Sequence, residues 1–335
     1  ASAGGYAIVS VLCCIALLWA WAQVAGDDAL GTSRKVSAAT LAYVSKAGVP
    51  AEDVHGVAAL ATAVGATGPE PLSDPLTLLR FYIGHGRCVK RAASKYRATM
   101  KWRAEYSIQS VMAEYGQAGE YLKNGGRATD AARWTWRKHP GTDAAKLGVR
   151  HAFFSRLRRH DPIDGAPILV WQIGRADFDG FVREGIVGEL IRAFVAHLED
   201  ALQSSRAASL QRRRLVRARL VIEAKDFALS AVRHLRVLVG ILDLCERHYP
   251  EVLATITVVR TPLAAAQVYR MVSPFVPDLV RRKLGVFGDD FEEALRRHSG
   301  LDISLLPACL GGSASDSELG AAELVPIDLG RRAVC

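Results

Sequence analysis

The stretch YPEVLATITVVRTPLAAAQVYRMVSPFVPDLVRRKLGVFG, residues 249–288, decides the fold of this chain. Its β-branched run at 255–259 predicts a buried strand. Pro262 follows, and proline stops a strand while suiting the first turn of a helix. The helix predicted at 263–272 is mostly apolar, and two further prolines come soon after it. The stretch therefore predicts a strand, a turn and an apolar helix in close succession.

Short apolar strands and amphipathic helices also alternate on the amino-terminal side of this stretch. Such alternation is typical of a mostly parallel sheet whose strands are joined by crossover helices. We predict strands at 168–173, 220–222, 255–259 and 284–288, and helices at 188–202, 232–249 and 291–301.

Helices alone are predicted nearer the amino terminus. Ser73 and Asp74 are cap candidates, and Pro75 suits the first helical position. A second helix is predicted at 89–106, where aromatic and small residues recur at steps of three and four. The fold class is therefore α/β, with a helical module before the sheet.

Five motifs follow one another along the chain: Leu78-Leu79-Arg80-Phe81, Trp102-Arg103 with Tyr106, Tyr249-Pro250-Glu251, Arg260-Thr261-Pro262, and Leu306-Pro307 before Gly311-Gly312. In this order they resemble the Sec14-like, or CRAL-TRIO, lipid-binding family over about residues 73–312. The resemblance implies that the sheet and its helices enclose a lipid cavity and that the helix at 262–272 is a movable lid.

We expect three groups of site residues, of which the first two follow from the resemblance. The headgroup is expected to contact Glu251, Lys283, His85 and Arg87. The lid and cavity wall are expected to include Pro262, Leu263, Val268, Met271, Val272 and Phe275. Arg281 and Arg282 are expected to face an anionic bilayer, where a basic residue contributes about 1 kcal/mol.

Two positions depart from the family pattern for the phosphate site. His85 stands where the family carries the second arginine of its basic arm, and Val280 stands where it carries a threonine. Arg87 is a candidate to replace the missing arginine. The departures predict that phosphatidylinositol binds more weakly than in the family or not at all, and they leave a second ligand open.

We expect five segments. These are an apolar segment at 1–26, a helical linker region at 27–72, the helical module at 73–125, the lipid-binding domain at 150–312 and a mobile tail at 313–335. The uncharged run at 7–25 is just long enough for a bilayer core of about 30 Å. Three interpretations of that run stay open: a retained membrane anchor, a cleaved signal peptide, or an artefact of the gene model.

Composition and motifs narrow the function. The 335 residues carry a net charge of +9 and are 50% hydrophobic, which provides a core and favours anionic partners. No nucleic-acid-binding motif accompanies the charge, so we expect no nucleic-acid partner. No nucleophile elbow, phosphate-binding Walker loop or zinc-protease motif is present, so we expect no enzymatic activity and no catalytic residues, metal or cofactor.

The expected function is transfer or exchange of a single phospholipid, with phosphatidylinositol favoured, at an anionic membrane surface. The alternatives are a membrane-anchored lipid-sensing or tethering module and a carrier of another hydrophobic molecule, such as a retinoid or tocopherol. We expect a monomer in the cytoplasm that associates with membranes peripherally or through residues 7–25.

Overall fold

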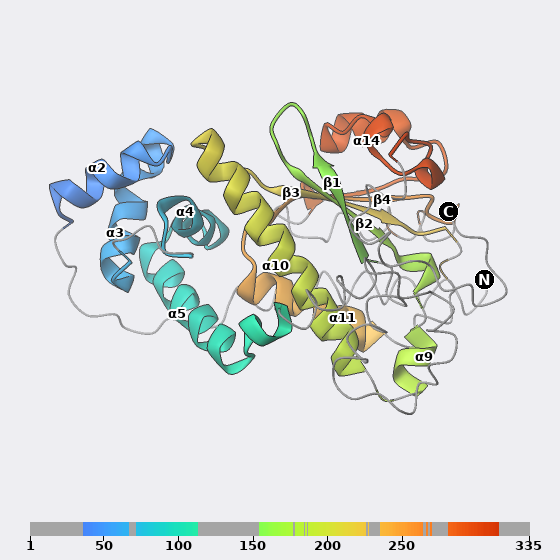
Figure 1. Cartoon of the computed structure of the whole chain (residues 1–335), viewed down its shortest axis with the longest axis horizontal. Helices are drawn as coiled ribbons and strands as arrows, with labels where there is room; N and C mark the ends of the chain where they lie inside the picture. The colour runs from blue at the N-terminus through green and yellow to red at the C-terminus, as the bar shows by residue number, and fades with distance from the viewer. Residues whose placement is uncertain are drawn as a thin grey trace, which may run out of the picture.

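A computed structural model of the chain describes residues 36–66, 72–112, 154–176, 178–183, 187–225, 235–263 and 281–314, and residues 185, 227, 266 and 269. Helices dominate its amino-terminal part, and a five-stranded sheet organises the rest (Figure 1). The predicted mobile tail at 313–335 and the apolar run at 7–25 lie almost entirely outside the described residues.

The amino-terminal helices share one hydrophobic core. They are α2 (Ala38–Lys46), α3 (Val54–Val64), α4 (Pro75–Gly84) and α5 (Val89–Glu105), with the short 3-10 turn η1 (Ala51–Asp53) before α3. Val44, Leu60, Leu79 and Tyr96, one from each helix, belong to the same buried cluster. α2 and α3 lie in the predicted helical linker region at 27–72, and they pack against α4 and α5.

The predicted start of α4 follows from its local sequence. Asp74 is the N-cap, and its Oδ1 accepts a hydrogen bond from the backbone N–H of Thr77 at 3.0 Å. Pro75 occupies the first helical turn, where a missing N–H costs nothing. Arg206 pairs with the same aspartate at 2.7 Å, so this cap also joins α4 to helix α10 (Val187–Arg212).

The sheet has the order β1-β2-β3-β4-β5. Its strands are β1 (Phe154–His160), β2 (Pro167–Gln172), β3 (Ala218–Glu223), β4 (Leu253–Val259) and β5 (Leu284–Val286). β1 is antiparallel to β2, and the other neighbours are parallel. The prediction of an α/β fold with a helical module and a mostly parallel sheet is confirmed, and all four predicted strands are present.

Helices cover both faces of the sheet. On one face lie α9 (Phe178–Arg183), α10 (Val187–Arg212) and α11 (Leu235–His248); on the other lie α14 (Glu292–Ser299) and the 3-10 turns η5 (Ile303–Leu305) and η6 (Ala308–Leu310). A further 3-10 turn, η2 (Ile173–Arg175), follows β2. In Figure 1, α14 lies above the sheet, α9 and α11 lie below it, and α10 runs diagonally from below the sheet to the upper left.

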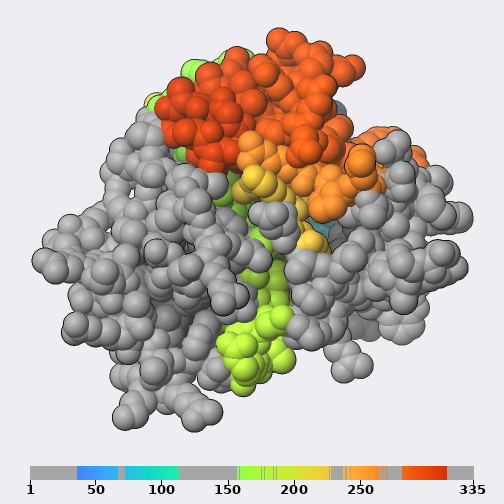
Figure 2. All heavy atoms as spheres, turned by 90° about the vertical axis from the view of Figure 1, so that its right-hand side faces the viewer, coloured from blue at the N-terminus to red at the C-terminus, as the bar shows by residue number. Residues whose placement is uncertain are grey.

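The alternation of side chains along β2 explains this arrangement. Leu169 and Trp171 belong to the cluster with α9 and α10, whereas Ile168 and Val170 belong to the cluster with α14. Successive strand residues point to opposite faces, so a continuous apolar run is what a doubly covered strand requires. Figure 2 shows residues 281–314 over the upper part of one side of the molecule and α9 at its lower edge.

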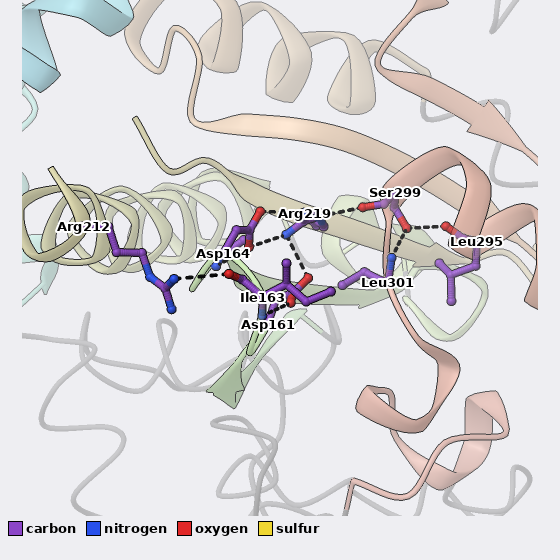
Figure 3. Close-up of polar contacts among 9 residues, drawn as sticks. Asp161, Ile163, Asp164, Arg212, Arg219, Leu295, Ser299 and Leu301 are labelled. Atoms are coloured by element: carbon purple, nitrogen blue, oxygen red, sulfur yellow. Dashed lines mark hydrogen bonds and ion pairs between the residues drawn. The ribbon is translucent and has the colours of Figure 1, made fainter. Parts of the chain in front are cut away.

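A closed ion cluster ties the β1–β2 turn to β3 and α14 (Figure 3). Arg219 on β3 donates to Asp164 through Nη1 and Nη2 at 2.9 and 2.7 Å and to the carbonyl of Ser299 through Nε at 2.6 Å. Its Nη1 also lies 3.2 Å from Asp161. All three nitrogens of this guanidinium have partners, so it stabilises the fold.

Candidate functional site

The turn before β4 has an unusual backbone. It contains the motif Tyr249-Pro250-Glu251, and Glu251 has a φ of 53°, in the left-handed region that side chains other than glycine rarely adopt. Arg80 on α4 donates to the carbonyl of Glu251 at 2.5 Å, and its guanidinium is almost completely buried. A hydrogen bond from the helical module thus stabilises this turn.

The carboxylate of Glu251 lies between two cations. Its Oε1 accepts from Lys283 Nζ at 2.6 Å, and its Oε2 accepts from Arg217 Nη1 at 2.5 Å. Burial alone raises the pKa of Glu251, but the charges and hydrogen bonds of Lys283 and Arg217 outweigh burial and lower that pKa below its usual value. Glu251 is therefore ionised at neutral pH.

Lys283 and Arg217 are more accessible than the acid that joins them. The exposed fractions of their side chains are 25% and 37%, against 4% for Glu251. Arg217, Glu251 and Lys283 come just before β3, β4 and β5, which are neighbours in the sheet. The site is thus at the amino ends of three adjacent parallel strands.

His85 and Arg87, the other two predicted headgroup residues, contact the helical module. His85 caps α4, and burial, then Lys95 and Arg91, lower its pKa to about 4, so it is neutral at physiological pH. Arg87 pairs with Asp53 of the helical module through two hydrogen bonds at 2.7 and 3.2 Å. Among the described residues, neither side chain has a hydrogen bond or ion pair with Glu251 or Lys283, and their headgroup roles stay predictions.

The start of the predicted lid is partly described. Pro262 is exposed, and the side chain of Leu263 is 77% exposed. Arg260, just before the lid, is paired with the buried Glu223 at 3.0 Å. Val268, Met271, Val272 and Phe275 lie outside the described residues, so the lid and the lipid cavity beneath it stay predictions.

Arg281 and Arg282 are both exposed and directly precede Lys283. Their exposure suits the predicted contact with an anionic surface, and that role also stays a prediction.

Comparison with known proteins gives the family. Residues 157–312 match the family model described as the CRAL/TRIO domain. Residues 157–312 are therefore identified as a CRAL-TRIO domain. Such a domain implies binding of a lipid or another small hydrophobic ligand, and CRAL-TRIO proteins are generally carriers and not enzymes.

Several relatives contain the same region. A CRAL-TRIO domain-containing protein of Caenorhabditis elegans is 25% identical over 263 residues, 76% of this chain and 32% of its own length. The protein real-time of Aedes aegypti is 24% identical over 72% of this chain and 33% of its own length. This chain thus spans about a third of both proteins.

Two further matches are closer to this chain in length. A yeast CRAL-TRIO domain-containing protein is 21% identical over 72% of this chain and 71% of its own length. The crystal structure of Sfh5 matches with a TM-score of 0.47 and 12% identity, over 79% of this chain and 85% of that one.

A buried polar network joins the helical module to the CRAL-TRIO domain. Arg103 on α5 forms a bidentate ion pair with the buried Glu199 on α10, and Tyr249 donates to the same carboxylate at 2.7 Å. Trp102 stacks on His248 with 4.0 Å between ring centroids. The motif tyrosine beside Glu251 is therefore held by both parts of the chain.

A small pocket lies at this junction. It is lined by Arg80, Thr99, Arg103, Leu202 and Tyr249, among others, and its volume of about 10 Å³ holds at most a single water molecule. Within the ranges that the structure describes, there is no helix long and apolar enough to cross a membrane and no cluster of metal-ligating side chains.

Neither Arg217 nor the role of Arg80 was predicted from the sequence. Arg217 stands in a run of five arginines at residues 212–219, and nothing in that run marks which one meets Glu251. Arg217 directly precedes β3, which neighbours β4, and only the folded sheet shows this.

Proposed function

We propose that this chain holds a single phospholipid, with phosphatidylinositol as the expected ligand, and exchanges it at anionic membranes. The observation that carries the proposal is the Glu251–Lys283 pair, formed at 2.6 Å between residues 32 positions apart in a CRAL-TRIO domain. Lys283 is partly exposed, so its remaining ammonium hydrogens are available to a phosphate. Glu251 can accept hydrogen bonds from inositol hydroxyls.

The lipid tails need a different environment. Each buried CH₂ contributes about 0.8 kcal/mol, so two long tails bind strongly only where water is excluded. The proposed lid at 262–272 supplies that exclusion. Leu263 at its start is exposed, and an exposed apolar side chain beside a membrane-docking lid can enter the bilayer.

Exchange then requires no covalent step. Basic residues, with Arg281 and Arg282 foremost, bring the chain to an anionic surface, each contributing about 1 kcal/mol. The lid swings out, a bilayer lipid replaces the bound one, and the lid closes. We expect a monomer at the cytoplasmic side of the membrane and no cofactor apart from the lipid.

Transfer of labelled lipid between vesicles tests this proposal. We expect Glu251→Ala and Lys283→Ala each to reduce phosphatidylinositol transfer. The matched controls are Glu293→Ala and Arg247→Ala, which remove exposed members of helical ion pairs and should behave as wild type. Unchanged phosphatidylinositol transfer in both site variants would remove the headgroup assignment.

One observation favours a second function. The uncharged run at 7–25 is long enough to anchor the chain, and an anchored module would sense lipid or tether membranes without carrying lipid between them. Fractionation separates the two: resistance to high-salt and carbonate washes supports the anchored module, whereas release by either wash supports the carrier.

A further inference from the structure

Arg217 and Lys283 approach one carboxylate from opposite sides. β4 lies between β3 and β5 in the sheet, so the residues that precede the outer strands flank Glu251. Arg217 Nη1 and Lys283 Nζ contact different oxygens of that carboxylate, at 2.5 and 2.6 Å. Both cations therefore lie within reach of one small anion, and the three side chains together carry a net charge of +1.

The positions of Arg217 and Glu251 are set by a single buried group. Arg80 donates to the carbonyl of Val216, the residue before Arg217, and to the carbonyl of Glu251, both at 2.5 Å. Gly84, the last residue of α4, lies so close to Pro250 that an added Cβ would be 2.8 Å from the proline ring. The end of α4 therefore packs directly against this turn. The pair is therefore built into the fold and is not an accident of two flexible surface side chains.

Among the described residues, the guanidinium of Arg217 uses fewer of its nitrogens than that of Arg219 two residues later. Arg219 uses Nε, Nη1 and Nη2 on two aspartates and a carbonyl, and its side chain is 14% exposed (Figure 3). Among the described residues, Arg217 pairs with Glu251 through Nη1, and its side chain is 37% exposed. Nε and Nη2 can thus bind an anion in the bidentate geometry that guanidinium groups form with phosphate.

The segment that contains His85 and Arg87 supplies no free cation to the site. His85 is neutral where the family carries an arginine, and Arg87 is occupied by Asp53. We propose that Arg217 binds the phosphate of the ligand together with Lys283, while Glu251 remains between them as counter-ion and acceptor. This inference rests on the proposed function, and it names the residue that supplies the second positive charge of the headgroup site.

Uptake of fluorescent phosphatidylinositol from vesicles, with phosphatidylcholine uptake in parallel, tests the inference. A charge-assisted hydrogen-bond pair corresponds to about a tenfold change in affinity, so we expect Arg217→Gln to weaken phosphatidylinositol binding about tenfold. Phosphatidylcholine carries the same phosphodiester, so any uptake of it should weaken as well, and Arg217→Lys should recover part of both losses. Arg247→Gln, which removes an equally charged arginine from an exposed ion pair, should match wild type.

The outcomes separate this inference from the proposed function. If Arg217→Gln binds phosphatidylinositol like wild type while Lys283→Ala loses it, Arg217 is only a counter-ion of Glu251 and the inference is wrong, although the proposed function stands. If the wild-type chain takes up neither lipid, the proposed function fails and the inference fails with it.

A measurement on the wild-type chain avoids any folding defect of the variants. Bound phosphatidylinositol should slow the modification of Arg217 by phenylglyoxal, mapped by peptide mass spectrometry, and leave Arg247 unaffected. The same protection by inorganic phosphate would show that the site takes free phosphate, whereas protection by the lipid alone would restrict it to the headgroup. Equal modification of Arg217 with and without both ligands would overturn the inference.

Discussion

Replacing Arg80 by methionine removes the guanidinium that joins the helical module to the site. Its side chain is 2% exposed, and it donates to two carbonyls, those of Val216 and Glu251, each at 2.5 Å. A buried acceptor that loses its donor costs about 1–3 kcal/mol. Removing a buried charge offsets part of this, because the desolvation cost of the arginine disappears as well.

We therefore expect Arg80→Met to lower the free energy of unfolding by about 2–4 kcal/mol. Urea denaturation followed by circular dichroism measures this change through the midpoint. The control is Arg97→Met on α5, because Arg97 also donates to a carbonyl, that of Ala63, but at an exposed position; it should stay within about 0.5 kcal/mol of wild type. If Arg80→Met unfolds at the same urea concentration as wild type, Arg80 does not hold the turn.

Three further predictions concern the network, the acid and the lid. Arg103→Met leaves the buried Glu199 without its cation and should cost about 3–5 kcal/mol in urea denaturation, whereas Tyr249→Phe removes one hydrogen bond and should cost about 1–2 kcal/mol; equal costs would contradict the network. Because the pKa of Glu251 is lowered in the folded chain, the stability it adds is present above its unfolded value of 4.5 and is lost as the pH falls through the lowered value. The difference in unfolding free energy between wild type and Glu251→Gln should therefore shrink as the pH falls below 4.5, and a constant difference would count against the ion pairs. Leu263→Asp should weaken co-sedimentation with anionic vesicles and leave the melting temperature unchanged, and undiminished binding would exclude that side chain from the docking surface.

The parts of the fold that the sequence predicted are those with local signals. The apolar run before Pro262 became β4, and the cap at Asp74 began α4 where expected. β1 was missed because it is an edge strand with the sequence FSRLRRH, and charged residues on an edge strand hide its pattern. α10 extends to Arg212, ten residues past the predicted end, because Ser205 and Ser209 are buried by tertiary packing that their polarity does not reveal.

The site residues also fall into those that the sequence predicted and those that it did not. Glu251 and Lys283 were predicted because each stands in a recognisable motif, and the structure brings them together. Arg217 and Arg80 could not be assigned because their contacts join residues 34 and 171 positions apart. Only the folded order of β3, β4 and α4 shows which cations converge on Glu251.

Native mass spectrometry of the purified chain, after incubation with vesicles of mixed phospholipids, tests the central claim most directly. We predict one phosphatidylinositol per chain in wild type, with occupancy reduced in Lys283→Ala. A chain that emerges without a phospholipid, or with a small hydrophobic molecule such as a retinoid or tocopherol in its place, would contradict the proposed function.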